Sequence, residues 1–437
     1  MSWQLILLLY GGIMMGCLCG GVAIGTAIGL VGIFGITLSS GMDMWLSLGD
    51  VVWNTTNTFT LVSIPLFVLM GELILRSGIS QRFYNGSSKL LAFLPGGLLQ
   101  TNIVGCAIFS AIAGSTVATA LTVGTVAIPE LDKRGYSDKL TLGSLAAGGC
   151  LGILLPPSIP LIVYGSMVQV SIIDLFMAGI IPGLTLAGLF MVYCTVRVLI
   201  TPSLVPRTKE QVSSAILFVA LRDTLPVLLL VVAVIGSMYK GFVTPTEAAA
   251  LGASLSFVIA LAYGQASLSM VWSSLRNAVF TSTVMMFIVV NAQILNFAIT
   301  TSGVGSGLAV ALAGLGIPPL VFFSLLFLVY LVLGMFVDGL SIMLLTVPLL
   351  YPSFISMGFD PIWVGIIIVV FIELGALTPP MGLNLFAILS IAPEGTTLPK
   401  VAVSAAPFAV IIALFSYLLY ALPQLVLWLP MTLKGGS

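Results

Sequence analysis

Apolar residues occur along this chain in long continuous runs, and polar residues are confined to short stretches between them. Runs of about 20 residues, enough to cross a bilayer as a helix, recur from Leu5 to Leu429. A transmembrane β-barrel would instead alternate apolar and polar residues in segments of about 10. The pattern therefore predicts an all-α polytopic membrane protein. The first run lacks the charged start and the cleavage site of a signal peptide, so we interpret it as a membrane helix.

The order of the runs predicts one series of elements that occurs twice. In the first half we expect helices near 3–20, 22–38 and 54–78, an interfacial arm near 79–93, a long segment near 96–133, a broken helix near 138–173 and a helix near 176–203. The second half repeats this series from about residue 222.

Two segments, 96–133 and 319–354, are about twice as long as a membrane span. Small or polar residues interrupt each of them midway, in IFSAIAGSTVATA (108–120) and LGMFVDGLSIM (333–343). Each segment is either two full helices joined by a tight turn or a re-entrant hairpin whose tip stops at mid-depth. Polar tips that contain glycine and face a proline-broken helix favour the re-entrant hairpin.

Each half also contains a double proline inside apolar sequence, in LGILLPPSIP (151–160) and LGALTPPMGL (374–383). A proline removes a backbone donor and clashes with the preceding turn, so the helix breaks there. Irregular backbone at membrane depth is tolerated only where it is buried in protein or lines a wet cavity. In transporters, unwound carbonyls and half-helix ends coordinate cations near the midplane. The two breaks therefore predict a binding site.

The double prolines begin 223 positions apart, at Pro156 and Pro379, and the same offset matches further prolines and glycines. Segment 129–139 contains three basic residues, whereas its equivalent, 352–362, contains no Lys or Arg. Because basic loops stay in the cytoplasm, equivalent loops should lie on opposite sides of the membrane. We therefore expect two inverted-topology repeats, each with a re-entrant helical hairpin and a Pro-Pro-broken transmembrane helix.

Composition narrows the function. The chain is 59% hydrophobic and 6% charged, against about 25% charged residues in soluble domains. Its net charge is zero, so the basic face of a nucleic-acid-binding protein is not expected. It contains no histidine, which excludes Ser-His catalysis, HExxH zinc sites and histidine haem ligation. The buried acids Glu72, Asp338 and Glu373 have no spacing that suggests a catalytic pair. We do not expect an enzyme.

The tips and breaks offer mainly hydroxyls and carbonyls as ligands: Ser110, Ser115, Thr116 and Ser158 in the first half, and Asp338, Ser341 and Thr378 in the second. Hard oxygen ligands suit a hard cation, and the shortage of acids favours a monovalent ion over calcium. A proton relay would require a carboxylate chain or histidine, for which only Asp338 and Glu373 are available. Sodium is therefore the expected ion. Asp338 is either a ligand or a helix cap, and Glu373 is expected to brace the second break.

Six stretches carry a resemblance to a known family: FTLVSIPLFVLMGELILRSGIS (59–80), FSAIAGSTVATA (109–120), IPELDKRGYS (128–137), LPPSIPLIVYG (155–165), VTPTEAAALGA (243–253) and LGALTPPMGLNLF (374–386). Together they resemble the large membrane subunit, the DctM-type permease, of tripartite ATP-independent periplasmic (TRAP) transporters. The similarity runs from about residue 10 to residue 425.

The resemblance implies sodium-coupled import of an organic acid across the bacterial inner membrane by an elevator mechanism, in a fold like that of the ion transporter superfamily. It also implies two partners, a small four-helix membrane subunit and a periplasmic substrate-binding protein. The domain division it implies is as follows: scaffold helices and arm in 1–95, hairpin and broken helix of the transport domain in 96–175, scaffold helices and second arm in 176–318, second hairpin and broken helix in 319–395, and a C-terminal helix in 396–437.

The same resemblance implies three groups of site residues. A first sodium site between the first tip and the first break maps to Ser110, Ser115, Gly152, Leu155 and Ser158. A second maps to Gly334, Asp338, Gly375, Thr378 and Met381. The substrate is expected beside Thr116 and the proline pairs Pro156, Pro157, Pro379 and Pro380, with its carboxylate on hydroxyls or N–H groups of the tips.

Two other classes of protein stay open from the residues alone. One is a stand-alone sodium- or proton-coupled anion symporter that uses no binding protein. The other is an ion channel, which would need a continuous polar pore and is less compatible with two closed tips that face two breaks. The particular organic acid is not determined by this sequence.

Overall fold

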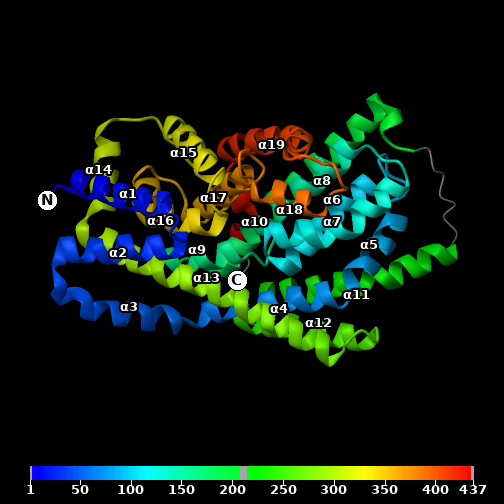
Figure 1. The fold of residues 1–437 in the computed structure, drawn as a ribbon, viewed down its shortest axis with the longest axis horizontal. Helices are drawn as coiled ribbons and strands as arrows, with labels where there is room; N and C mark the ends of the chain where they lie inside the picture. Colours follow the sequence, from blue (N-terminus) through cyan, green and yellow to red (C-terminus); the bar gives the residue numbers. More distant parts are fainter. Residues whose placement is uncertain (1, 207–213, 435–437) are drawn as a thin grey trace.

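The structure is a computed structural model that describes residues 2–206 and 214–434 (Figure 1). These residues form twenty α-helices joined by turns and four short 3-10 helices. The helices of the first half are α1 (Trp3–Cys19), α2 (Ile24–Ser40), α3 (Leu46–Thr56), α4 (Ser63–Arg76), α5 (Ile79–Leu90), α6 (Leu98–Ala113), α7 (Thr116–Lys133), α8 (Asp138–Cys150), α9 (Ile159–Val168) and α10 (Ile172–Ile200). Those of the second half are α11 (Ser214–Tyr239), α12 (Pro245–Ala262), α13 (Leu268–Ser302), α14 (Val304–Gly314), α15 (Pro319–Gly334), α16 (Gly339–Ser356), α17 (Pro361–Ala376), α18 (Leu383–Ile391), α19 (Leu398–Ala421) and α20 (Gln424–Lys434).

The all-helical prediction is confirmed, and the order of elements recurs between the halves. Helices α7 and α16 each have 18 residues, and they begin 223 positions apart, at Thr116 and Gly339. Helices α8 and α17, which precede the two breaks, begin at the same offset. Seven helices of the described chain are long and apolar enough to cross a membrane. The structure is therefore that of a multi-pass membrane protein.

One predicted helix differs from the structure. The sequence predicts a helix near 54–78, but α3 ends at Thr56, a 3-10 turn covers Phe59–Val62, and α4 begins at Ser63. Pro65 lies in the first turn of α4, the position where a helix tolerates a residue without an N–H. The equivalent part of the second half contains no proline and forms α13, a single helix of 35 residues. The interruption is therefore local and belongs to one half.

The C-terminal segment also differs, because 396–437 was expected to be one helix. Its described part forms α19 and α20, with Leu422 and Pro423 between them. Leu422 leaves the helical conformation, at φ −126° and ψ 69°, as expected for a residue that precedes a proline. The second helix, α20, packs against α10.

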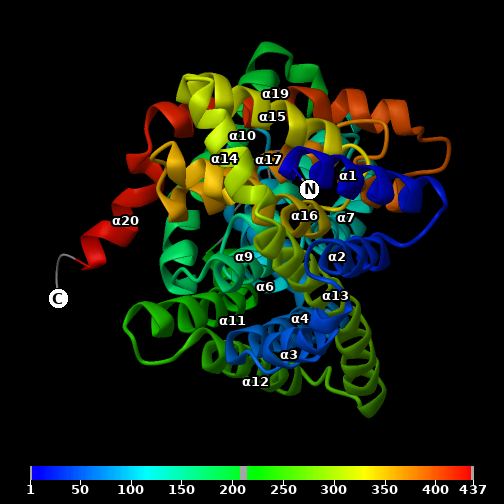
Figure 2. The same ribbon diagram turned by 90° about the vertical axis from the view of Figure 1, so that its left-hand side faces the viewer.

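The helices pack in two sets that lie on opposite sides of the molecule (Figure 1). Figure 2, turned by 90°, also places α3, α4, α11 and α12 opposite α15 and α19. In the first set α13 packs along α2, α3 and α4. Gly32 of α2 permits the close contact with α13, since a β-carbon at this position would lie 2.7 Å from the backbone nitrogen of Leu295.

The second set contains the helix pairs α6–α7 and α15–α16 and the two broken helices, α8–α9 and α17–α18. Within it α7, α8, α18 and α19 pack together. Helix α10, which the expected boundary at residue 176 would assign to the next scaffold segment, packs on α6, α8, α9 and α17. The pairs differ in closeness, because α6 and α7 pack along each other whereas α15 packs mainly on α17 and α16 on α14. This set supplies most of the residues that line the central cavity described below.

Candidate transport site

The first tip is a two-residue turn between α6 and α7. Gly114 adopts a left-handed conformation with φ 58°, which ends α6. Ser115 is extended and stands at the N-cap position of α7. The tip touches the first break, because a β-carbon on Gly152 would lie 2.5 Å from the carbonyl oxygen of Ser115.

The first break follows α8. A 3-10 turn covers Leu151–Ile153, and α9 begins at Ile159. The Pro156–Pro157 bond is cis, as is Pro379–Pro380 in the second break. Two serine hydroxyls bind carbonyls of the break. Ser110 donates to the carbonyl oxygen of Leu151, which also accepts the backbone N–H groups of Leu154 and Leu155, and Ser158 donates to that of Ile153. Because the break is buried, the bond from Ser158 satisfies a carbonyl that water does not reach.

The second tip and the second break are also in direct contact. Asp338 caps α16, and its Oδ2 accepts a hydrogen bond of 3.0 Å from the backbone N–H of Ser341. The backbone N–H of Met381 donates to the carbonyl oxygen of Met335 at 3.1 Å. A β-carbon on Gly375 would lie 2.5 Å from the Cα of Gly334. Thus tip and break meet through the backbone, as in the first half.

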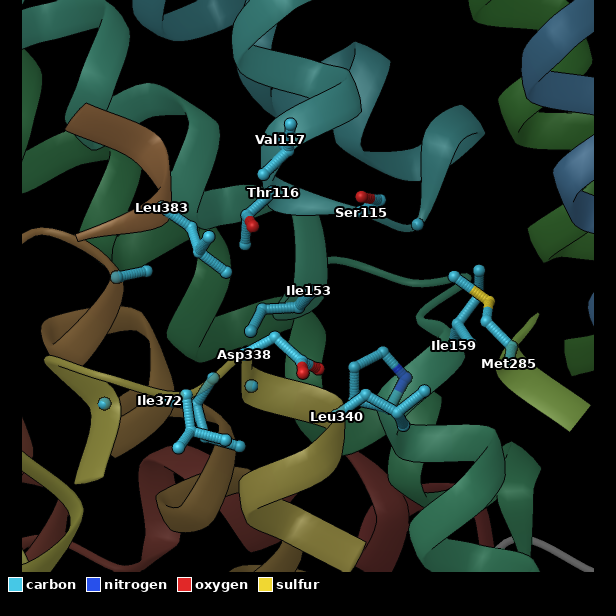
Figure 3. Close-up of a pocket in the computed structure, with 16 residues that line it drawn as sticks. Ser115, Thr116, Val117, Ile153, Ile159, Met285, Asp338, Leu340, Ile372 and Leu383 are labelled. Atoms are coloured by element: carbon cyan, nitrogen blue, oxygen red, sulfur yellow. The ribbon is translucent and has the colours of Figure 1, made fainter. Parts of the chain in front are cut away.

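A cavity of about 160 Å³ lies where the two tips and the two breaks converge. In Figure 3 the side chains of Thr116 and Asp338 point into it from opposite sides. Of the residues expected at the site, four line this cavity: Ser115, Thr116, Gly334 and Asp338. Among the lining residues Asp338 is the one ionisable group.

Helix ends of both polarities meet at this cavity. Its lining includes the first residues of four helices, Thr116 of α7, Ile159 of α9, Gly339 of α16 and Leu383 of α18. It also includes residues at four C-terminal ends, Gly114 after α6, Ile153 of the 3-10 turn, Gly334 of α15 and Ala376 of α17. Helix starts present N–H groups that attract anions, and helix ends present carbonyls that attract cations. The cavity therefore offers places for both charges.

The remaining expected residues do not line the cavity and lie in α6, in the two breaks and at the end of α17: Ser110, Gly152, Leu155, Pro156, Pro157, Ser158, Gly375, Thr378, Pro379, Pro380 and Met381. The two breaks differ in exposure, because Pro156 and Pro157 are buried whereas Pro379, Pro380 and Met381 are exposed. The Thr378 hydroxyl donates to the carbonyl oxygen of Leu374 at 2.7 Å.

Met285 and Asn384 are not predicted from the sequence, because only tertiary packing brings Met285 to the cavity and Asn384 to α8. Met285 of α13 lines the cavity, and it belongs to the other set of helices. Asn384 is fully buried, and its Nδ2 donates to the Ala146 carbonyl and to Cys150 Sγ, both at 3.2 Å, which ties α18 to α8. Met285 has no local signal. The polar Asn384 within apolar sequence could have been noticed.

The oxygen atoms of the site suit a monovalent cation. Within the described ranges no three His, Cys, Asp or Glu residues gather as a metal site. The buried Ser341 hydroxyl and the Glu373 carboxylate have no hydrogen-bond partner in the described part of the chain. Hydroxyls and carbonyls at a polar tip match a hard, singly charged ion better than a divalent ion, which would require several carboxylates.

A multi-pass helical bundle with a mid-bundle cavity between broken helices defines a membrane transporter as the class of protein. The chain belongs to the family described as the DctM component of the tripartite ATP-independent periplasmic transporter, whose match covers residues 12–431. It is thus a large permease subunit of a TRAP transporter and a multi-pass protein of the inner membrane, not an enzyme. The resemblance inferred from the motifs is confirmed.

The chain is similar to relatives that are named for the transport of different acids. It is 34% identical to the C4-dicarboxylate TRAP transporter large permease protein DctM of Pseudomonas aeruginosa, over 92% of this chain and 93% of that one. It is 30% identical to the sialic acid permease SiaM of Vibrio cholerae, with 96% and 97% covered. Among solved structures, the YdaH transporter of Alcanivorax borkumensis matches with a TM-score of 0.60 at 15% identity, covering 89% of each chain.

Proposed function

We propose that this chain imports an organic acid together with sodium ions by an elevator movement, fed by a periplasmic binding protein and held by a small four-helix membrane subunit. The observation that carries the proposal is the convergence of four helix starts and four helix ends on one cavity between the tips and breaks. The two relatives named above are, by their names, permeases for C4-dicarboxylates and sialic acid, and a third, YiaN of Escherichia coli, 30% identical, is one for 2,3-diketo-L-gulonate. All of these acids carry a carboxylate.

Sodium binding is proposed at each tip and break. In the first half the oxygens of Ser110, Ser115 and Ser158 and the carbonyls of Gly152 and Leu155 would surround the ion. In the second half Asp338, Thr378 and the carbonyls of Gly334, Gly375 and Met381 would do so. The hydroxyls of Ser110 and Ser158 already bind carbonyls of the first break, so an ion there would join an existing oxygen network.

The substrate carboxylate is proposed at the starts of α7 and α16, beside Thr116. Among the described residues no Lys or Arg lines the cavity, and Asp338 would repel a carboxylate. Helix starts supply only partial positive charge. A bound sodium ion supplies a full charge close by, and in a site of low dielectric this attraction is strong. We therefore expect substrate to bind only after sodium.

Movement is proposed for the set of helices that holds both tips and both breaks, relative to the set that contains α13. The two inverted repeats would make the outward and inward states near mirror images, as in other transporters of this architecture. Two sodium ions entering with one carboxylate carry net positive charge inward. Each net charge gains about 2.3 kcal/mol per 100 mV of membrane potential, so voltage would assist uptake.

The test is uptake of labelled succinate, 2,3-diketogulonate and sialic acid into proteoliposomes that hold this chain and its small subunit. The binding protein and an inward sodium gradient are each supplied or omitted. We expect that one of the three acids is taken up, and only when the binding protein and the sodium gradient are both present. Uptake with sodium but no binding protein would indicate a stand-alone symporter, and uptake driven by a proton gradient alone would contradict the sodium sites.

A matched pair of variants locates the ion. The hydroxyls of Thr378 and Thr283 each donate to the helix carbonyl four residues earlier, both at 2.7 Å, but only Thr378 lies in a break. We expect Thr378→Val and Ser115→Ala to raise the sodium concentration for half-maximal uptake about tenfold, since each removes a ligand oxygen worth roughly 1.4 kcal/mol. Thr283→Val should leave that concentration unchanged. Equal effects of the two threonine variants would contradict the second sodium site.

A further inference from the structure

A second cavity, of about 340 Å³, lies between α3, the 3-10 turn after it, the end of α9 and the last turns of α13. Most of its lining residues carry an amide or a hydroxyl, and none of them carries a charge. We call this cavity the outer cleft and define it by the six polar residues Asn54, Thr58, Gln169, Gln293, Asn296 and Thr300.

The amides of the outer cleft are positioned by short contacts. Asn296 Nδ2 donates to Gln293 Oε1 at 3.2 Å, and both side chains are half-buried. Gln169 Nε2 donates to the carbonyl oxygen of Ser166 at 2.6 Å. A primary amide has two N–H donors and a carbonyl oxygen with two lone pairs. Each of these amides therefore keeps hydrogen-bonding capacity for a ligand.

Such a set of polar groups is costly in a membrane helix unless water or a ligand meets it. Gln293, Asn296 and Thr300 recur on one side of α13, which is long and apolar enough to span the bilayer. Burying an unpaired amide in hydrocarbon costs several kcal/mol. Polar side chains at such positions mark substrate pathways in transporters.

The outer cleft is aligned with the central cavity along two shared helices. Helix α9 contributes Ile159 and Pro160 to the central cavity and Ser166 to the outer cleft. Helix α13 contributes Met285 to the central cavity and Gln293 to the outer cleft. At 1.5 Å per residue the separation is about 9 Å along α9 and about 12 Å along α13. The two cavities therefore lie on one seam between the two sets of helices.

We propose that the outer cleft is a second substrate site, which holds a hydroxyl-bearing monocarboxylic acid on its way to the central cavity. This inference rests on the proposed function for the path, but not for the binding itself. Neutral amides and hydroxyls recognise substrate hydroxyls as both donors and acceptors, and their N–H groups bind one carboxylate. A site without a basic residue does not offset the second charge of a dicarboxylate. Binding here needs no sodium, since the residues that line the cleft include no acid and none from the two proline breaks.

The test measures binding of labelled gluconate to the full chain in nanodiscs, in sodium-free buffer, with hexanoate as competitor. The two acids have equal carbon number, and only gluconate carries hydroxyls. We expect gluconate to bind and hexanoate not to displace it. Asn296→Leu and Gln293→Leu should weaken binding roughly three- to tenfold, the effect of one lost hydrogen bond. Ser115→Ala, in the central cavity, should leave sodium-free binding unchanged.

Two adjacent threonines give a matched pair of variants, because the two substitutions should affect folding equally. Thr300 and Thr301 are both exposed, and each hydroxyl donates to the helix carbonyl four residues earlier, at 2.8 and 2.9 Å. Thr300 lines the outer cleft and Thr301 does not. Thr300→Val should weaken gluconate binding about threefold, and Thr301→Val should not change it.

Three results would overturn the inference: no gluconate binding, equal displacement by hexanoate, or equal behaviour of the Thr300 and Thr301 variants. Loss of sodium-free binding in Ser115→Ala would place the ligand in the central cavity instead. If sodium-driven uptake fails while cleft-dependent gluconate binding persists, the proposed function is wrong and the outer cleft stands as a binding site.

Discussion

Asp338 has one role that the structure shows, as a helix cap, and one that stays predicted, as an ion ligand. Its Oδ2 accepts the backbone N–H of Ser341, which caps α16, while the carboxylate also faces the central cavity (Figure 3). The sequence left these roles as alternatives, and the structure confirms the cap. Ion binding by the same carboxylate stays a prediction.

The two roles separate on substitution. Asp338→Asn retains a side-chain oxygen for the cap but removes the charge, so we expect an unchanged unfolding temperature and a higher sodium requirement for uptake. Asp338→Ala removes both, and it should also lower the free energy of unfolding by about 1 kcal/mol, the usual value of an N-cap. Thermal unfolding and sodium titration of uptake measure the two effects. If Asp338→Asn behaves like the native chain in both assays, Asp338 is only a cap.

The contact between Gly334 and Gly375 leads to a second prediction at this scale. Because a β-carbon on Gly375 would meet the Gly334 Cα at 2.5 Å, and backbone yields less than a side chain, Gly375→Ala should force the second tip and break apart. We expect a loss of about 1–3 kcal/mol in stability, the usual cost of overpacking, together with loss of uptake.

Gly188→Ala is the matched control, since Gly188 also lies within a helix, α10, and a β-carbon there meets nothing within 4 Å. Uptake and the unfolding temperature in detergent are measured for both variants. Normal uptake by the Gly375→Ala chain would show that the second tip and break do not need this close approach.

At the scale of elements, the proline-broken helices are held by polar contacts that cross between the halves. Asn384 of α18 binds the Ala146 carbonyl of α8, and Cys150 Sγ donates to the Glu373 carbonyl of α17 at 3.4 Å. The sequence predicts that both breaks exist, because double prolines act locally. It does not predict these partners, because they depend on how distant helices pack. For the same reason Met285 was missed.

Asn384 is the element-scale test. Asn384→Leu removes the donor to the Ala146 carbonyl, which keeps its contact with Cys150 Sγ, so the free energy of unfolding should fall by about 1 kcal/mol, the net value of one hydrogen bond. Asn85→Leu, on an exposed face of α5, is the control and should change it by less than about 0.5 kcal/mol. Thermal unfolding in detergent compares the two chains. An Asn384→Leu chain as stable as the control would show that the α8–α18 contact is held by apolar packing alone.

The limits of the sequence prediction at this scale have a physical cause. The pattern predicts helices α6 to α9 and α15 to α18 well, since glycine tips and prolines end helices wherever they occur. It misses α3, because that helix is short and mixes polar with apolar residues, and it starts α4 at about residue 54 because it does not recognise the turn at 57–62. A pattern of hydrophobicity does not register a turn of that length.

At the scale of the whole molecule, the recurring order of elements agrees with the repeat seen in the sequence, whereas the inversion of the halves stays a prediction from loop charge. Lys133 and Ser356 end the equivalent helices α7 and α16, are 223 positions apart and are both exposed. Inverted repeats place them on opposite sides of the membrane.

This placement is testable with a membrane-impermeant maleimide on intact cells. Ser356→Cys should be labelled from outside, and Lys133→Cys only after the membrane is permeabilised. The unmodified chain, whose five cysteines provide the background, is the blank. Labelling of both positions from the same side would mean that the halves are parallel.

The unequal exposure of the two double prolines has a consequence for the order in which bound ions would leave. Ions held by equivalent sets of ligands would still leave at different rates, because Pro379–Met381 are exposed on the surface of the chain whereas Pro156 and Pro157 are buried. The ion at the exposed break would equilibrate with the adjoining solution while the other stays trapped until the surrounding helices rearrange. Release from this conformation would therefore be sequential, with a fast phase and a slow phase, although the two halves of the chain are built on one plan.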